Sequence, residues 1–110
     1  MTVEPTPGEA KFWALVEPLL ARPGVERSTM MGLPCLRTHG AFFASCDRTT
    51  GDLLVKLPET RVDQLVDADR ARSFAPAGRR FRQWAAIPPQ RSRTWKRLVD
   101  EALAFVEGTR

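Results

Sequence analysis

The chain has 110 residues, 43% of them hydrophobic and 27% charged, with a formal net charge of +4 at pH 7. This length predicts one domain that can bury a core without disulfide bonds. The composition excludes a disordered chain and a disulfide-rich scaffold, and no apolar run approaches the ~20 residues that span a bilayer. The N-terminal residues show no basic start followed by an apolar stretch, so we expect no signal peptide and a cytoplasmic location.

The first predicted element is a helix that begins near Thr6. Thr6 can cap it, Pro7 suits its first position, and Glu9 completes a capping box. Pro18 predicts a kink or an early end, because it lacks an N–H group and crowds the carbonyl of Ala14. The apolar residues at helical spacing are Phe12, Leu15, Val16 and Leu19.

A meander of strands follows, at residues 26–31, 33–38, 41–46 and 53–57. His39-Gly40 suits the two-residue type I′ turn of a β-hairpin. A regular hairpin would place Arg37 opposite Phe42, Cys35 opposite Ala44, Leu33 opposite Cys46, Leu36 opposite Phe43 and Thr38 opposite Ala41.

The rest of the chain is predicted as a short helix (59–68), a loop (69–77), a strand (79–87) and a final helix that Ser92 caps and Gly108 ends. Phe74 is expected to anchor the loop on the core. Strand alternation places Arg80, Arg82 and Trp84 on the outward side. This order predicts a single α+β domain, with its core at about 9–107. A mostly antiparallel sheet, formed by the meander and the late strand, packs with N-terminal, short middle and C-terminal helices.

Six short motifs stand in order along the chain: MGLPCL (31–36), GAFFA (40–44), LVKLP (54–58), FAPAGR (74–79), Trp84 with IPP (87–89), and the apolar stripe from Trp95 to Val106. Together they resemble the TfoX N-terminal-domain family (TfoX/Sxy-like), which overlaps in fold with the MmcQ/YjbR family. The resemblance covers about 12–106. It implies a compact α+β domain of a bacterial protein with no established catalytic residue. TfoX-type proteins regulate competence genes together with a DNA-bound activator.

Positive charge is concentrated in one part of the chain. The run from Arg70 to Arg97 holds nine basic residues and no acidic one, whereas the rest of the chain holds eight basic and thirteen acidic residues. Such a run favours phosphate contacts with nucleic acid, and Trp84 or Phe81 could stack on a base or take a cation–π contact with an arginine. The candidate nucleic-acid-binding residues are Arg79, Arg80, Arg82, Trp84, Arg91, Arg93, Lys96 and Arg97.

An alternative interpretation is that these arginines only solvate one face and cover Trp84 with their stems. The protein would then be a protein-interaction or small-ligand-binding module. Under the first interpretation it is a small non-enzymatic regulator whose partner is nucleic acid or a DNA-bound transcription factor, with no membrane contact.

No other residues suggest catalysis or metal binding. Cys35, His39 and Cys46 do not have the spacing of a structural zinc site, and the regular hairpin would place the two cysteines ~7 Å apart on one face, too far for an unstrained disulfide. His39, the only histidine, has no nucleophile in a recognised arrangement. We therefore predict no enzyme, no catalytic residue, no metal and no cofactor.

Overall fold

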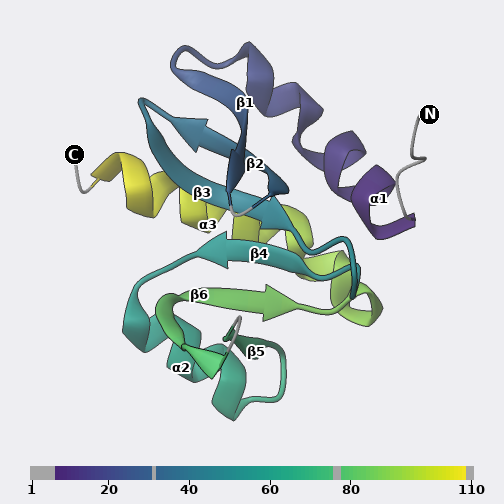
Figure 1. Ribbon diagram of the computed structural model, residues 1–110. Helices are drawn as coiled ribbons and strands as arrows, with labels where there is room; N and C mark the ends of the chain where they lie inside the picture. The colour runs from purple at the N-terminus through teal and green to yellow at the C-terminus, as the bar shows by residue number, and fades with distance from the viewer. Residues whose placement is uncertain (1–6, 31, 76–77, 109–110) are drawn as a thin grey trace.

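A six-stranded antiparallel sheet forms the centre of the molecule, with its strands in the order β1-β2-β3-β4-β6-β5 (Figure 1). The computed structural model describes residues 7–30, 32–75 and 78–108. N-terminal, middle and C-terminal helices accompany the sheet, so the predicted α+β class is confirmed. The elements are α1 (Pro7–Val16), the 3₁₀ helix η1 (Glu17–Ala21), β1 (Val25–Met30), β2 (Leu33–Thr38), β3 (Ala41–Cys46), β4 (Leu53–Lys56), α2 (Glu59–Asp67), β5 (Arg72–Phe74), β6 (Phe81–Ile87), the 3₁₀ helix η3 (Pro89–Thr94) and α3 (Trp95–Gly108).

The main hydrophobic core lies between the helices and one face of the sheet. Figure 1 shows α3 crossing behind the central strands. The apolar stripe predicted for α3 is buried there, from Trp95 at its start to Val106 near its end. Full burial of such side chains stabilises the fold by ~1.5–3 kcal/mol each. The other helices contribute Phe12, Val16, Val62 and Leu65, and the strands contribute Leu36, Phe43, Leu53, Val55 and Ile87, among others.

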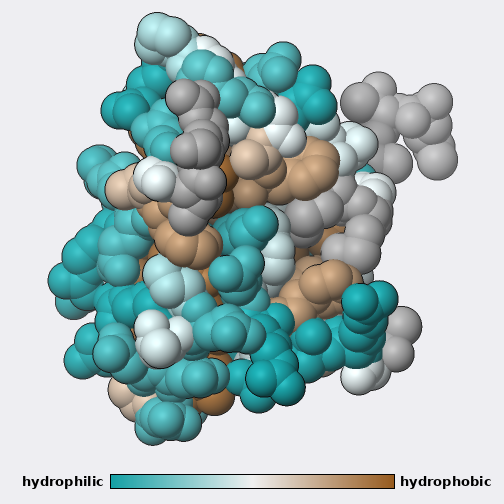
Figure 2. Space-filling model, turned by 90° about the vertical axis from the view of Figure 1, so that its left-hand side faces the viewer, coloured by the Kyte–Doolittle hydropathy of each residue, from teal (hydrophilic) through white to brown (hydrophobic). Residues whose placement is uncertain are grey.

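A smaller hydrophobic cluster lies on the opposite face of the sheet. It consists of Leu54, Phe74, Trp84 and Ala86, and further apolar side chains of β2, β3 and β6 pack against it. Phe74 is buried, as predicted for an anchor. Strands β4 and β6 are therefore buried on both faces where they pair. The side of the molecule drawn in Figure 2 is mostly hydrophilic, with hydrophobic residues gathered between hydrophilic ones.

The central hairpin has the predicted turn but not the predicted register throughout. His39 and Gly40 both have positive φ, 50° and 85°, as a type I′ turn requires. Next to the turn, Arg37 faces Phe42 and Thr38 faces Ala41, as expected.

A β-bulge then shifts the pairing between Leu36 and Arg37. Beyond it Cys35 faces Ser45, so the expected pairs of Cys35 with Ala44, Leu36 with Phe43 and Leu33 with Cys46 are wrong. Because adjacent residues of a strand point to opposite faces, Cys46 lies on the other face from Ser45 and Cys35.

Prolines lie in the first turn of each of the two 3₁₀ helices, η1 after α1 and η3 before α3. Helix α1 ends at Val16, and the chain continues as η1 with Pro18 in its first turn, which confirms the predicted early end. Pro88 precedes η3 and Pro89 is its first residue. Because η3 occupies residues 89–94, α3 begins at Trp95 and the prediction that Ser92 caps it is wrong. Ser92 Oγ instead accepts a hydrogen bond from Lys11 Nζ at 3.3 Å.

Two further strands differ from the sequence prediction. The predicted loop 69–77 contains a short strand, β5, which was not expected. Strand β6 begins at Phe81 rather than Arg79. The predicted cap Thr6 lies outside the described residues. None of the described helices is long and apolar enough to cross a membrane.

Candidate nucleic-acid interface

The basic run from Arg70 to Arg97 passes through β5, β6, η3 and the first turn of α3. All nine of its basic side chains are exposed. They fall into an early pair, Arg70 and Arg72, and two larger sets. We call Arg79, Arg80 and Arg82 the β6 group, and Arg91, Arg93, Lys96 and Arg97 the η3 group.

The β6 group lies beside α2. Arg80 Nη2 donates to Asp63 Oδ1 of α2 at 3.1 Å. The guanidinium of Arg79 lies over the ring of Phe81, 5.5 Å from its centroid. Arg82 lines an open hollow with Lys56 and Glu59. Two of the three arginines, Arg79 and Arg82, thus present charge without a carboxylate partner among the described residues.

Trp84 does not belong to this exposed surface. It is only 9% exposed and packs with Leu54 and Phe74 in the smaller hydrophobic cluster. The expectation that it faces outward and stacks on a base is wrong. Strand alternation does separate Trp84 and Ala86 from Ala85 and Ile87, but both sets are buried because both faces of β6 are covered at this point.

The η3 group lies at the other end of β6. Arg91 and Arg93 are exposed on η3, and Arg97 is exposed on the first turn of α3. Lys96 Nζ pairs with Asp100 one helical turn later at 3.2 Å. Lys96 also lines a small hollow with Leu15 and Leu19, so it points towards α1 and η1 rather than towards Arg91.

The two groups do not form one patch. Strand β6 has seven residues, which at ~3.3 Å per residue span ~20 Å. The β6 group lies at the start of this strand, and the η3 group follows its end. Figure 1 shows β6 starting near α2 and running to the opposite side of the molecule, where η3 leads into α3.

Ion pairing distinguishes the basic run from the rest of the chain. Outside the run, the arginines that pair with a carboxylate are Arg22, Arg37, Arg48 and Arg61. Within the run, the described structure pairs only Arg72, Arg80 and Lys96. The six arginines of the run with no carboxylate partner among the described residues are Arg70, Arg79, Arg82, Arg91, Arg93 and Arg97.

Sequence reasoning missed the place where the early pair meets the η3 group. Arg70, Arg72 and Arg91 line one hollow, together with Asp52 from the turn between β3 and β4. Arg72 Nη2 donates to Asp52 Oδ2 at 2.6 Å. The basic run includes Arg70 and Arg72, but the sequence does not show that they lie near η3. The pairing of β5 with β6 brings them there, and β5, with three residues, is too short to be recognised in the sequence.

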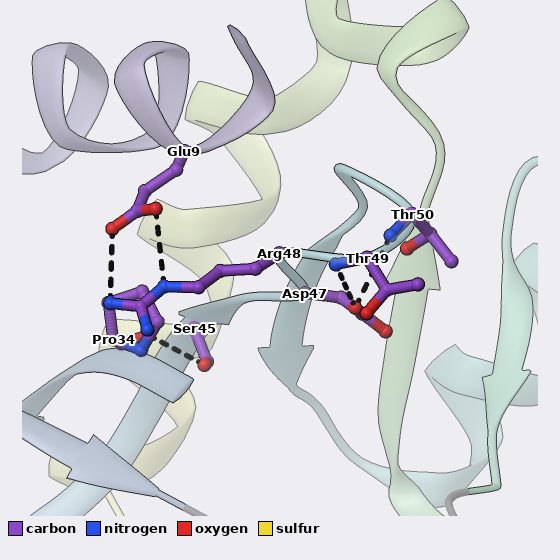
Figure 3. Close-up of polar contacts among 7 residues, drawn as sticks. All are labelled: Glu9, Pro34, Ser45, Asp47, Arg48, Thr49 and Thr50. Carbon is purple, nitrogen blue, oxygen red and sulfur yellow. Dashed lines mark hydrogen bonds and ion pairs between the residues drawn. The ribbon is translucent and has the colours of Figure 1, made fainter. Parts of the chain in front are cut away.

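The turn between β3 and β4 is held in place from two sides. Figure 3 shows Arg48 reaching from this turn to Glu9 of α1, with hydrogen bonds of 3.2 and 3.4 Å to the two carboxylate oxygens. Within the turn, Asp47 Oδ1 accepts hydrogen bonds from the backbone N–H groups of Thr49 and Thr50 (Figure 3). At the end of β3, the hydroxyl of Ser45 donates to the carbonyl of Pro34 at 2.7 Å. The turn is therefore a fixed wall for the hollow beside it.

The cysteines and the histidine remain apart from the basic groups. Both thiols are buried, and burial raises the pKa of Cys46 to about 12 and raises that of Cys35 as well. His39 is exposed in the hairpin turn, where its backbone N–H donates to the carbonyl of Gly24 at 2.9 Å. Among the described residues, no three side chains of the types that ligate metals come together.

No family model, curated protein or solved structure matches this chain. The resemblance to the TfoX N-terminal domain therefore stays a prediction from the sequence motifs.

Proposed function

We propose that the protein binds the phosphate backbone of nucleic acid through the exposed arginines of the β6 and η3 groups, without catalysing a reaction. The observation that carries this proposal is the set of arginines in the basic run that have no carboxylate partner among the described residues. An unpaired guanidinium keeps all its hydrogen-bond donors for a partner, and phosphate is the anion that its planar fork fits best.

The spacing of the two groups favours a long polyanion over a small anion. Groups at the two ends of β6, a strand ~20 Å long, can both be contacted by a duplex, which carries one charge per ~1.7 Å of axis. Because Trp84 is buried, the proposal includes no base stacking. It predicts contacts to phosphates, which carry no sequence information, and hence binding with little sequence preference.

The reactive side chains support binding rather than catalysis. A raised pKa keeps the Cys46 thiol neutral, and a neutral thiol is a poor nucleophile. His39 is exposed in a surface turn, whereas both cysteines are buried, so neither thiol shares its exposed surface.

Fluorescence anisotropy with a labelled duplex tests the proposal between about 50 and 200 mM salt. Four to six phosphate contacts give a slope of log K against log salt of roughly −4 to −5. Replacing Arg79 and Arg82 with Gln should make the slope shallower by ~2, because two contacts are lost. Replacing Arg93 and Arg97 with Gln should have a similar effect.

The matched control replaces Arg22 and Arg27 with Gln. It removes the same charge from Arg22, which directly follows η1, and from Arg27 in β1, both outside the basic run, and it should leave the slope unchanged. Absence of binding at the lowest salt concentration would contradict the proposal, as would a control variant that binds as weakly as the test variants. In that case an acidic protein becomes the better candidate partner.

A further inference from the structure

A hollow of about 700 Å³ lies where three separate segments of the chain meet. The turn between β3 and β4 forms one wall, the residues that lead into β5 form the second, and the start of η3 forms the third. Its size is within the range of small-ligand sites. The residues that line it are Thr50, Asp52, Asp69, Arg70, Ala71, Arg72, Pro88, Pro89, Gln90 and Arg91.

Three guanidinium groups surround this hollow. Arg70 and Arg91 have no carboxylate partner among the described residues. Arg72 is held by one bond to Asp52, yet its side chain is 62% exposed, so most of its five N–H donors remain available. A single phosphate has enough acceptor oxygens to receive bonds from all three arginines.

The hollow also offers acceptors and an apolar surface. Asp52 is 4% exposed, and its Oδ1 atom has no hydrogen-bond donor among the described residues. Asp69 adds a second carboxylate at the rim. Pro88 and Pro89 supply apolar rings. Two carboxylates disfavour a ligand that is anionic throughout, and they favour one that also carries hydroxyl donors.

The backbones that carry the arginines are fixed. The N–H of Arg70 donates to the carbonyl of Leu65 at 2.8 Å, and Asp69 just before it takes a left-handed conformation with φ 58°. The N–H of Arg91 donates to the carbonyl of Pro88 at 2.9 Å. Backbone that is already ordered loses little entropy when a ligand binds.

We propose that this hollow binds a sugar phosphate. The phosphate oxygens accept hydrogen bonds from Arg70, Arg72 and Arg91, ring hydroxyls donate to the aspartates, and the apolar face of the sugar packs on Pro88 and Pro89. A free metabolite and the 5′-terminal nucleotide of a nucleic acid share this chemistry. Arg91 belongs to the η3 group and also lines the hollow, whereas the arginines replaced in the duplex test, Arg79, Arg82, Arg93 and Arg97, do not line it.

NMR titration of the full chain with ribose 5-phosphate tests the site. Saturable shifts should centre on residues 69–72 and 88–91, and ribose without phosphate should produce none of them. Arg70→Gln and Arg91→Gln should each weaken binding at least about tenfold, as expected for the loss of a charged hydrogen bond.

The matched control is Arg93→Gln, which removes the same charge from the same 3₁₀ helix at a residue outside the hollow. It should change the affinity by less than about twofold. A control effect as large as that of Arg91→Gln would overturn the proposal, because charge alone would then explain binding. So would equal shifts with ribose, or no saturation by ~10 mM ribose 5-phosphate.

A short single strand with and without a 5′-phosphate identifies the source of the ligand. If the phosphorylated strand binds more tightly than ribose 5-phosphate, and Arg70→Gln loses this binding, the ligand is the end of a nucleic acid. If ribose 5-phosphate binds more tightly than the phosphorylated strand, the ligand is a free sugar phosphate. Loss of duplex binding in the Arg79 and Arg82 variant, with ribose 5-phosphate binding retained, separates this site from the proposed function.

Discussion

Cys46 is a buried thiol in an acidic setting. Burial contributes most to its raised pKa of about 12, and Glu9, Asp47 and Asp52 raise it further, while Arg48 opposes them. Because the thiolate is the reactive form, we expect a disulfide reagent to label neither cysteine of the native protein at about pH 8. Both should react at once in denaturant. Rapid labelling of the folded protein would contradict this prediction.

The same pKa predicts how stability depends on pH. An unfolded thiol ionises near pH 8.5. The neutral Cys46 thiol therefore stabilises the fold below about pH 8.5, and this contribution is lost as the pH rises towards about 12. Urea unfolding measures the free energy of unfolding of the wild type and of Cys46→Ala between about pH 8.5 and 10.5. Over this range the free energy of unfolding of the wild type should fall more steeply than that of the variant, by up to ~1.4 kcal/mol per pH unit. Parallel curves for the two proteins would contradict this assignment.

At the level of single residues, the sequence predicted contacts with the core better than exposure to solvent. Phe74 and Trp95 are buried as expected, since a large aromatic side chain gains most by leaving water. The sequence predicts Trp84 on the outward side because alternation defines the side of a strand but not what covers that side. Its burial depends on Leu54 and Phe74, which the fold brings to it from β4 and β5.

Helix α1 packs closely on the turn between β3 and β4 through two glycines. A Cβ atom on Gly8 would lie 2.7 Å from the Cα of Gly51, closer than real contacts allow. Gly8→Ala should therefore destabilise the protein by ~1–3 kcal/mol, even though alanine favours helix by ~1 kcal/mol over glycine. Urea unfolding measures this change in the free energy of unfolding.

Gly108 provides the matched control for that substitution. It is the last residue of α3, and a Cβ atom there would have no heavy atom within 4 Å apart from its chain neighbours and the nearby backbone of α3. Gly108→Ala should change stability by less than ~0.5 kcal/mol. An equal loss in both variants would show that the contact between α1 and the turn does not limit stability.

At the level of elements, the sequence predicted those with strong local signals. The hairpin strands β2 and β3 have the expected bounds, since His39-Gly40 specifies the turn between them. The β-bulge was missed because β3 reads AFFASC, a run without a polar residue at alternate positions, and such a run does not define a register. Strand β5 was missed because three residues are too few for a period to show.

At the level of the whole molecule, the excess of positive charge in the basic run is visible in the sequence, but its arrangement in space is not. Linear density suggested one basic face, whereas β6 separates the two groups and η3 turns Arg91 towards Arg70 and Arg72. Long-range strand pairing decides which charges meet, and the pairing of β5 with β6 has no counterpart in the charge pattern. The hollow is therefore a feature that only the fold reveals.

Thermal unfolding with duplex DNA tests whether this arrangement, rather than charge alone, attracts nucleic acid. The unfolded chain carries the same net charge of +4, so DNA that recognises charge alone binds both states and does not stabilise the fold. If the folded arrangement binds, DNA at ~100 times its Kd should stabilise the fold by ~2.7 kcal/mol and raise Tm by about 10 °C at low salt. Raising salt from about 50 to 200 mM lowers the affinity by roughly several hundredfold for a slope of −4 to −5, so the Tm shift should disappear.

Replacing Arg79 and Arg82 with Gln should make the Tm shift at low salt smaller. Replacing Arg22 and Arg27 with Gln should leave it unchanged. A Tm that DNA lowers, or a shift that survives the higher salt, would contradict phosphate contacts by the folded protein.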